Sequence, residues 1–90
     1  MAQVVWSREA LFHLDLIAAY IDQFNPEAGQ RFARRLFEAG ESLQQFPHRG
    51  HPDGGGGRVL AIVRPYLIRY RIADDTVLIL DIRHGRRGAP

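Results

Sequence analysis

The residues best able to do chemistry are arginines and one histidine in the second half of the chain. A ribonuclease that cleaves RNA through the 2′-hydroxyl needs a base, an acid and cations that stabilise the phosphorane. A histidine with several arginines can supply part of that set. The set is incomplete, because the chain has no lysine and no tyrosine follows the histidine. The candidate residues are Arg58, Arg69, Arg71, Arg83, His84, Arg86 and Arg87.

A structural role for these residues remains open. Asp81 can pair with Arg69 or Arg71 across neighbouring strands, which would neutralise the cationic surface. A histidine at the end of a strand, such as His84, more often hydrogen-bonds a backbone carbonyl than takes part in catalysis. The group therefore indicates either a functional cationic surface or a solvated sheet face crossed by ion pairs.

Charge is distributed unevenly along the chain. All 12 basic residues are arginine, and the net charge is +2. Residues 1–46 hold four arginines and six acids, whereas residues 47–90 hold eight arginines and four aspartates. A genome rich in G and C would explain the missing lysines but not this asymmetry. Arginine binds carboxylate and phosphate in bidentate fashion, so the second half suits an acidic partner.

Length and composition predict one globular domain, residues 1–90. The chain is 46% hydrophobic and 24% charged, which is typical of folded proteins. It has no cysteine, and its four histidines do not have the spacing of zinc ligands, so we expect no metal and no cofactor. Neither a signal peptide nor a membrane-spanning run is recognisable, which favours a cytoplasmic location.

Two amphipathic helices are expected in the first half. Ser7 is a suitable N-cap for the first helix, and Asn25-Pro26 for the second, which Pro47 should end. The buried stripe of the first helix is Ala10, Leu14, Ile17, Ile21 and Phe24, and that of the second is Ala28, Phe32, Leu36, Ala39, Leu43 and Phe46.

Apolar residues also lie on the outer sides of these helices, notably Phe12 and Leu16 on the first and Phe37 on the second. Such a surplus in a small domain indicates either a partner-binding surface or a helix pair that buries these residues itself. Both readings remain open.

The second half of the chain changes to a period of two. Residues 58–63, 66–72 and 77–84 are β-branched and aromatic runs joined by short turns, which predicts an antiparallel meander. Residues 48–57 are glycine-rich and are expected to form a flexible loop, and residues 85–90 a tail. With a short strand at residues 3–6, the predicted fold is α+β: a helical hairpin packed on a small antiparallel sheet.

A series of short motifs runs in order along nearly the whole chain. They are Ser7-x-Glu9-Ala10, Leu14-x-x-Ile17-x-x-Tyr20-Ile21, Asn25-Pro26-Glu27-Ala28, Arg31-Phe32, Ser42-Leu43-x-x-Phe46-Pro47-x-x-Gly50, Arg58, Tyr66-x-Ile68-x-Tyr70-Arg71 and His84-Gly85-x-Arg87. The series resembles the RelE/ParE superfamily of toxins from bacterial type II toxin–antitoxin modules. Gly29, Asp81 and Arg83 depart from the residues usual in that family.

Two activities are known in that superfamily. RelE-like members are ribosome-dependent mRNA endonucleases that use sheet lysines or a glutamate, arginines and a near-terminal histidine or tyrosine. ParE-like members lack that set and poison DNA gyrase. The absent lysines and Phe46-Pro47-x-x-Gly50 favour the ParE-like branch. The resemblance therefore implies a gyrase inhibitor, with a RelE-like nuclease and an inactive antitoxin-binding module as alternatives.

The resemblance also implies partners and sites. A cognate antitoxin should neutralise the toxin in a hetero-oligomer through an acidic C-terminal segment that folds on binding. We expect this segment to cover Phe12, Leu16, Arg69, Arg71 and Arg83. The target should meet His84, Arg86 and Arg87, and a nuclease site would draw on Arg58, Arg69, Arg71, Arg83 and His84.

Overall fold

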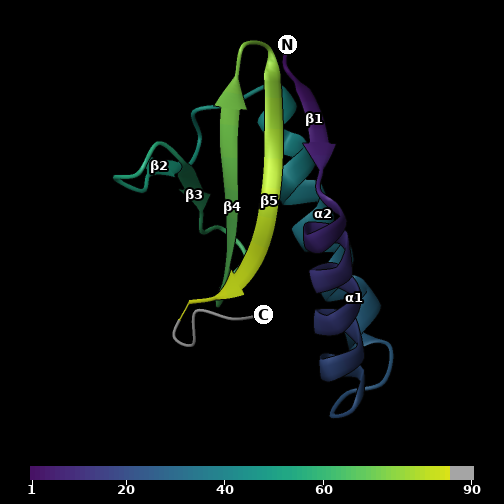
Figure 1. Ribbon diagram of the computed structural model, residues 1–90. Helices are drawn as coiled ribbons and strands as arrows, with labels where there is room; N and C mark the ends of the chain where they lie inside the picture. The colour runs from purple at the N-terminus through teal and green to yellow at the C-terminus, as the bar shows by residue number, and fades with distance from the viewer. Residues whose placement is uncertain (86–90) are drawn as a thin grey trace.

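The computed structural model of the protein describes residues 1–85 of the 90. Two helices pack on a five-stranded sheet, which confirms the α+β architecture (Figure 1). The elements in chain order are β1 (Gln3–Trp6), α1 (Arg8–Asp22), α2 (Ala28–Glu41), the 3₁₀ turn η1 (Ser42–Gln44), β2 (His51–Pro52), β3 (Arg58–Leu60), β4 (Tyr66–Ala73) and β5 (Thr76–His84).

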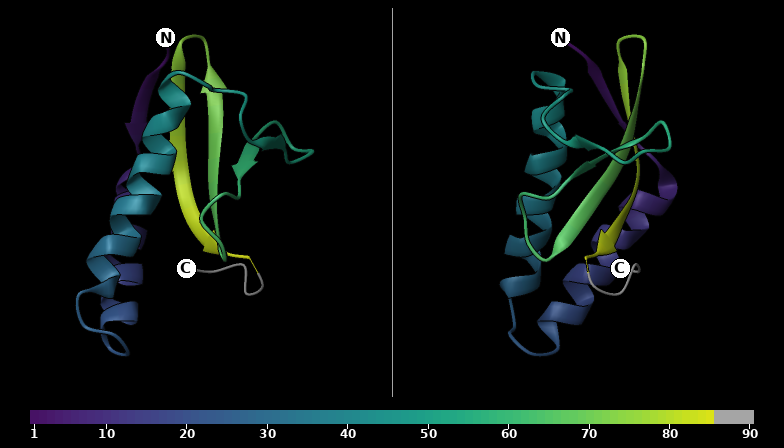
Figure 2. Two further views of the ribbon diagram at one scale, coloured as in Figure 1. Left: turned by 180° about the vertical axis from the view of Figure 1, so that it is seen from behind. Right: turned by 90° about the vertical axis from the view of Figure 1, so that its left-hand side faces the viewer.

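The sheet has the strand order β1-β5-β4-β3-β2. The meander β3–β4–β5 is antiparallel as expected, but β1 runs parallel to β5, so the sheet is mixed rather than antiparallel. The helical hairpin, α1 and α2, follows β1 in the chain and precedes the meander. In the sheet, β1 is the edge strand beside β5. In Figure 2, α2 lies along one face of the sheet and the tip of the helical hairpin extends beyond the strands.

Residues 48–57, expected as a loop, contain the strand β2 and a tight turn. β2 pairs with β3, and the carboxylate of Asp53 accepts hydrogen bonds from Gly55 N at 2.7 Å and Gly57 N at 3.0 Å. These backbone hydrogen bonds hold the pKa of Asp53 below its ordinary value. Gly54 and Gly56 have φ angles of 87° and 91°, which side chains rarely permit. The glycines therefore shape a hairpin here, and the flexibility of the segment stays a prediction.

The start of α1 is as the sequence predicts. The hydroxyl of Ser7 accepts a hydrogen bond from Ala10 N at 3.0 Å, which caps the helix. The same hydroxyl donates to the carbonyl of Leu80 at 2.7 Å. One side chain therefore both starts α1 and ties it to β5.

The expected start of α2 at Pro26 is wrong by two residues. Asp22, at the end of α1, accepts a hydrogen bond from Gly29 N at 2.8 Å, and Glu27 has a left-handed φ of 74°. A Cβ at Gly29 would collide with the carbonyl oxygen of Ala18. The cap therefore comes from the preceding helix, which approaches so closely that only glycine fits.

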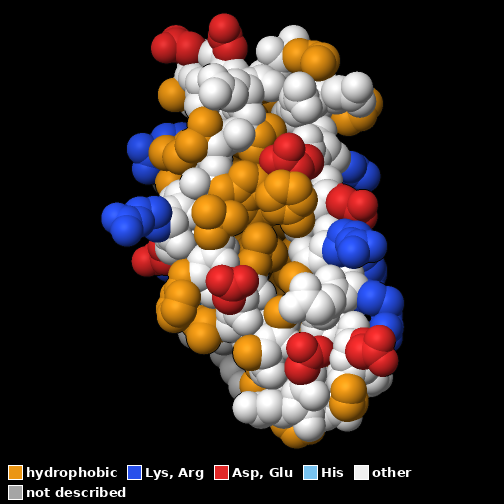
Figure 3. All heavy atoms as spheres, turned by 90° about the vertical axis from the view of Figure 1, so that its right-hand side faces the viewer, with side chains coloured by type: hydrophobic (Ala, Val, Ile, Leu, Met, Phe, Trp, Pro, Cys, Tyr) orange, Lys and Arg blue, Asp and Glu red, His pale blue; other side chains and the backbone are white. Residues whose placement is uncertain are grey.

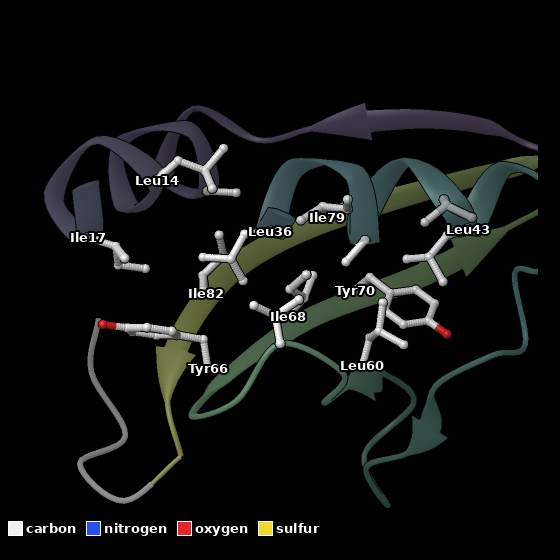
Figure 4. Close-up of a cluster of buried hydrophobic side chains, with 14 residues drawn as sticks. Leu14, Ile17, Leu36, Leu43, Leu60, Tyr66, Ile68, Tyr70, Ile79 and Ile82 are labelled. Atoms are coloured by element: carbon white, nitrogen blue, oxygen red, sulfur yellow. The ribbon is translucent and has the colours of Figure 1, made fainter. Parts of the chain in front are cut away.

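The core lies between the helices and the sheet, as Figure 4 shows. Three residues of the expected stripes are not part of it: Phe24 is 73% exposed, Phe46 is 60% exposed, and Ala28, at the start of α2, is half-buried. The two phenylalanines follow the ends of regular helix, where the 3.6-residue period no longer holds. The buried members are Ala10, Leu14, Ile17, Leu36, Ala39, Leu43, Leu60, Val63, Tyr66, Ile68, Tyr70, Val77, Ile79 and Ile82.

A β-bulge interrupts the pairing of β4 with β5. Arg69 lies opposite Asp81, but the next residue, Tyr70, lies opposite Ile79, so Leu80 has no partner on β4. The bulge reverses the alternation of β5 at this point. Toward the helices β5 buries Val77, Ile79 and Ile82.

Candidate docking surface

The candidate arginines and the histidine divide between the two sides of the sheet. Arg58 lies opposite Tyr70, and His84 lies opposite Tyr66; both tyrosines are buried on the side of the helices. Cross-strand partners share a face, so Arg58 and His84 belong to that side. The other side, which we call the open face, carries Val59, Leu67, Arg69, Arg71, Leu78, Asp81 and Arg83.

Arg58 is engaged in holding the segment that follows α2. Its guanidinium donates to the carbonyls of Gly50 at 2.6 Å and His48 at 3.1 Å, and to the hydroxyl of Tyr70 at 3.4 Å. That hydroxyl also accepts from Gly50 N at 3.0 Å and donates to the carbonyl of Pro47 at 2.8 Å. The network fastens residues 47–50 to the sheet and leaves Arg58 a structural role.

Asp81 neutralises Arg69 on the open face. Two parallel hydrogen bonds of 2.8 Å join the carboxylate to Nε and Nη2 of Arg69, and Nε of Arg83 lies 3.6 Å away. The Asp81 side chain is 5% exposed, and that of Arg69 is 33% exposed. The sequence analysis left open that an ion pair crosses the solvated sheet face. This alternative is confirmed for Arg69 and Asp81.

Asp81 and Arg69 shift each other's pKa values. Burial alone would raise the pKa of Asp81, but the hydrogen bonds and charge of Arg69, with Arg83 and His13 nearby, outweigh it and hold the pKa below its ordinary value. The hydrogen bonds from Asp81 raise the pKa of Arg69. Asp81 is therefore an anion at neutral pH despite its burial.

Two arginines of the open face remain available to a partner. Arg71 is exposed and makes no ion pair within residues 1–85, and the Arg83 side chain is 43% exposed. Both lie on strands flanked by half-buried apolar side chains, Leu67 and Leu78. The open face thus combines an unpaired Arg71 and a partly exposed Arg83, which also pairs with Asp81, with apolar surface, and this suits a peptide with acidic and apolar side chains.

The outer stripe of α1 adjoins this face. Phe12 is 58% exposed and Leu16 is 43% exposed, so the alternative that the helix pair buries them is wrong for both residues. His13 lies beside them, and its Nδ1 accepts a hydrogen bond from Ile82 N at 3.1 Å, so α1 lies against the edge of β5. The sequence analysis missed His13, because nothing in its local pattern marks a contact with a strand 69 residues away.

The residues expected to meet a target are only partly described. His84 is half-buried, and its ring centroid lies 5.7 Å from that of Tyr66 in an edge-on contact. Arg86 and Arg87 lie outside the described residues. Within residues 1–85, no three histidine, cysteine or acidic side chains are grouped closely enough to hold a metal ion. No helix in that part of the chain could span a membrane.

Comparison with known proteins identifies the class. A family profile described as "ParE toxin of type II toxin-antitoxin system, parDE" matches residues 4–88. The chain is 49% identical over 87 residues to Toxin RelE2 of Caulobacter vibrioides, covering 97% of this chain and 99% of that protein. A solved structure titled "Chromosomal ParDE TA system from P. aeruginosa" matches with a TM-score of 0.83 and 26% identity, covering 93% of this chain and 96% of that one.

These similarities define a toxin of a type II toxin–antitoxin module. Within that class, the chain belongs to the ParE toxin family.

Proposed function

We propose that this toxin inhibits DNA gyrase by docking to it, without a catalytic step of its own. The division of the candidate nuclease residues between two sides of the sheet carries the proposal. Arg58 and His84 lie on the helix side, whereas Arg69, Arg71 and Arg83 lie on the open face. Since Arg58 and Arg69 are also engaged within the fold, residues 1–85 do not bring a base and several unpaired cations together around one phosphate.

A second candidate is the ribosome-dependent mRNA endonuclease. The relative from Caulobacter vibrioides carries the name Toxin RelE2. Its site would have to be built from Arg71 and Arg83 on the open face, with His84 at the strand end. That site would lack Arg58, whose guanidinium is fixed by the carbonyls of His48 and Gly50.

The gyrase proposal is tested by incubating purified toxin with gyrase, ATP and plasmid. We expect gyrase-cleaved plasmid to accumulate in proportion to toxin. In our proposal the target meets His84, Arg86 and Arg87, so changing the three to alanine should abolish the cleavage. The Arg31→Ala, Arg34→Ala double variant removes the same two arginine charges from the exposed side of α2 and serves as the matched control.

A different result in this assay would overturn the gyrase proposal. If gyrase is unaffected and the toxin cuts mRNA at defined codons on translating ribosomes, the nuclease candidate replaces the gyrase proposal. Both targets are cytoplasmic, and we propose the cytoplasm as the location of the toxin.

We further propose that the cognate antitoxin neutralises the toxin by covering Phe12, Leu16, Arg69, Arg71 and Arg83. Support comes from the adjacency of the α1 stripe to the open face and from the exposure of Arg71 and Arg83. An acidic antitoxin segment should bind more weakly as salt rises, because exposed charges are screened. The Arg71→Ala, Arg83→Ala double variant should bind more weakly and with a smaller dependence on salt.

If affinity for the antitoxin is indifferent to salt and to these substitutions, the arginines of the open face are not part of the interface. The Arg31→Ala, Arg34→Ala double variant is again the control for the loss of two charges.

A further inference from the structure

The tip of the helical hairpin carries an exposed aromatic pair. Tyr20, in the last turn of α1, is 51% exposed, and Phe24, in the connection to α2, is 73% exposed. Their ring centroids lie 5.2 Å apart with an interplanar angle of 65°, so the rings meet edge to face. Both belong to the part of the hairpin that extends beyond the strands (Figure 2). We call residues 20–27 the hairpin tip.

The backbone of the hairpin tip is held in place by hydrogen bonds. The N–H groups of Phe24 and Asn25 both donate to the carbonyl of Ile21 at 3.0 Å. The carboxylate of Asp22 accepts from Gly29 N at 2.8 Å and so ties the two helices together. The two rings are therefore carried by an ordered backbone, and a partner loses little entropy in fixing it.

The hairpin tip lies in an acidic part of the chain. Residues 9–30 hold four acidic residues and no arginine, although the whole chain has a net charge of +2. Asp15 and Glu27 are exposed and form no ion pair within residues 1–85. In Figure 3, acidic and hydrophobic side chains lie at the lower end of the molecule, and the arginines lie above them. The aromatic pair therefore suits a partner surface that is apolar and bordered by positive charge.

The hairpin tip and the last strand point toward the same end of the molecule. Figure 1 shows β5 ending, and the helical hairpin turning, toward this end. His84, which we propose to meet the target, is the last residue of β5. The antitoxin segment of our proposal is acidic and would be repelled by the acidic hairpin tip. Position and charge both favour the target as the partner of the aromatic pair.

The exposed area of the two rings fits one anchor of a larger interface. An aromatic side chain buries roughly 150–250 Å² when fully covered, so two partly exposed rings offer on the order of 200–300 Å². A stable interface between two proteins needs about 800 Å² from each partner. The hairpin tip is too small to hold two copies of the toxin together, but it can anchor a partner that also covers the end of β5.

We propose that the hairpin tip docks on the protein surface of gyrase beside the DNA that gyrase holds, with Tyr20 and Phe24 packed between basic side chains. An enzyme that holds DNA presents lysines and arginines to the phosphates, so basic protein surface lies next to its DNA. The acidic hairpin tip suits that basic surface, whereas His84 at the other contact suits the phosphates. This inference rests on the proposed inhibition of gyrase and names a further part of the toxin that makes the contact.

The test measures the toxin concentration that gives half-maximal accumulation of gyrase-cleaved plasmid. Phe24→Ala should raise this concentration about ten-fold, as for a residue that anchors an interface. Tyr20→Ala is a second change in the same pair and should act in the same direction. Phe46→Ala is the matched control, because Phe46 is 60% exposed and lies beyond the opposite end of α2. It should leave the concentration within about two-fold.

The charge of the hairpin tip is tested separately. Glu27→Gln removes one negative charge from the tip, and its control, Glu38→Gln, removes one from the exposed side of α2. Only Glu27→Gln should raise the half-maximal concentration, by about two- to three-fold, as for the loss of an exposed ion pair. Its effect should shrink at high salt, which screens exposed charges. Circular dichroism of each variant checks that it folds.

The outcomes separate this inference from the proposed function. If wild-type toxin produces no cleaved plasmid, the proposed function falls and this inference falls with it. If wild-type toxin acts on gyrase and Phe24→Ala and Tyr20→Ala act equally well, only this inference is overturned.

Two other partners are recognised by the same variants. If Phe24→Ala weakens binding of the antitoxin and leaves gyrase inhibition unchanged, the aromatic pair belongs to the antitoxin interface. If wild-type toxin self-associates in sedimentation and Phe24→Ala does not, again with unchanged inhibition, the pair joins two copies of the toxin. Either result overturns docking of the hairpin tip on gyrase.

Discussion

Removing Arg69 should destabilise the protein more than removing its partner Asp81. Arg69→Met strands a carboxylate that is 5% exposed, whereas Asp81→Asn leaves a guanidinium that is 33% exposed and can turn to water. Breaking a buried pair costs about 3–5 kcal/mol. Arg83 remains 3.6 Å from Asp81 and Arg69 is partly solvated, so we expect about 2–3 kcal/mol for Arg69→Met. For Asp81→Asn we expect about 1 kcal/mol.

The loss of unfolding free energy in Arg69→Met should depend on pH. The folded-state pKa of Asp81 lies below its ordinary value of 3.8, so the pair stabilises the fold fully above pH 3.8 and loses this effect as the pH falls through the folded pKa. In Arg69→Met the buried carboxylate loses its main partner, and its pKa should rise. The deficit of this variant should therefore shrink as the pH falls from 7 toward 4, because protonation removes the stranded charge.

Urea unfolding at pH 7 and at pH 4 to 5 measures both effects. Arg71→Met is the control, because Arg71 lies on the same face and makes no ion pair within residues 1–85; it should change stability by less than about 0.5 kcal/mol. If Arg69→Met and Asp81→Asn lower the free energy of unfolding equally, this account of the pair is refuted. It is also refuted if the loss in Arg69→Met does not change with pH.

Three further substitutions test the fold. Tyr70→Phe should cost about 1–3 kcal/mol in urea unfolding, because a buried N–H of Gly50 loses its acceptor; Tyr20→Phe, at an exposed position, should cost almost nothing. Ser7→Ala should cost about 1–2 kcal/mol through the lost helix cap, and Ser7→Asp, which caps but cannot donate to Leu80, should recover only part of it. Gly29→Ala should cost about 1–3 kcal/mol by forcing the helices apart. An unchanged midpoint of urea unfolding would show that α1 and α2 can move apart without loss of stability.

Local patterns were sufficient for the two helices, apart from the start of α2, for the strands β1, β3, β4 and β5, and for most of the core. The hydroxyl of Ser7 caps α1 as its position predicts, and the alternation of Tyr66, Ile68 and Tyr70 places all three in the core. These features depend on residues close together in sequence. The helical period places Phe12 and Leu16 outside the core stripe, but their exposure was one of two alternatives that the sequence left open.

The features that the sequence could not predict depend on contacts between distant segments. The parallel pairing of β1 with β5 joins Val4 to Val77, and no local pattern selects that partner. The cap of α2 comes from Asp22 because two helices meet at Gly29, not because of the Asn-Pro pair. The bulge at Leu80 decides which face Asp81 occupies, and therefore that it pairs with Arg69 and Arg83.

The contact between α1 and β5 also bears on how the toxin behaves alone. β1 ends opposite Ile79, so the outer edge of β5 beyond it has no neighbouring strand within residues 1–85. A bare strand edge recruits strands of other molecules and leads to aggregation. Here the Ser7 hydroxyl donates to the carbonyl of Leu80 and Nδ1 of His13 accepts from the N–H of Ile82, so the N-cap of α1 and one side chain of that helix occupy the positions that an invading strand would use.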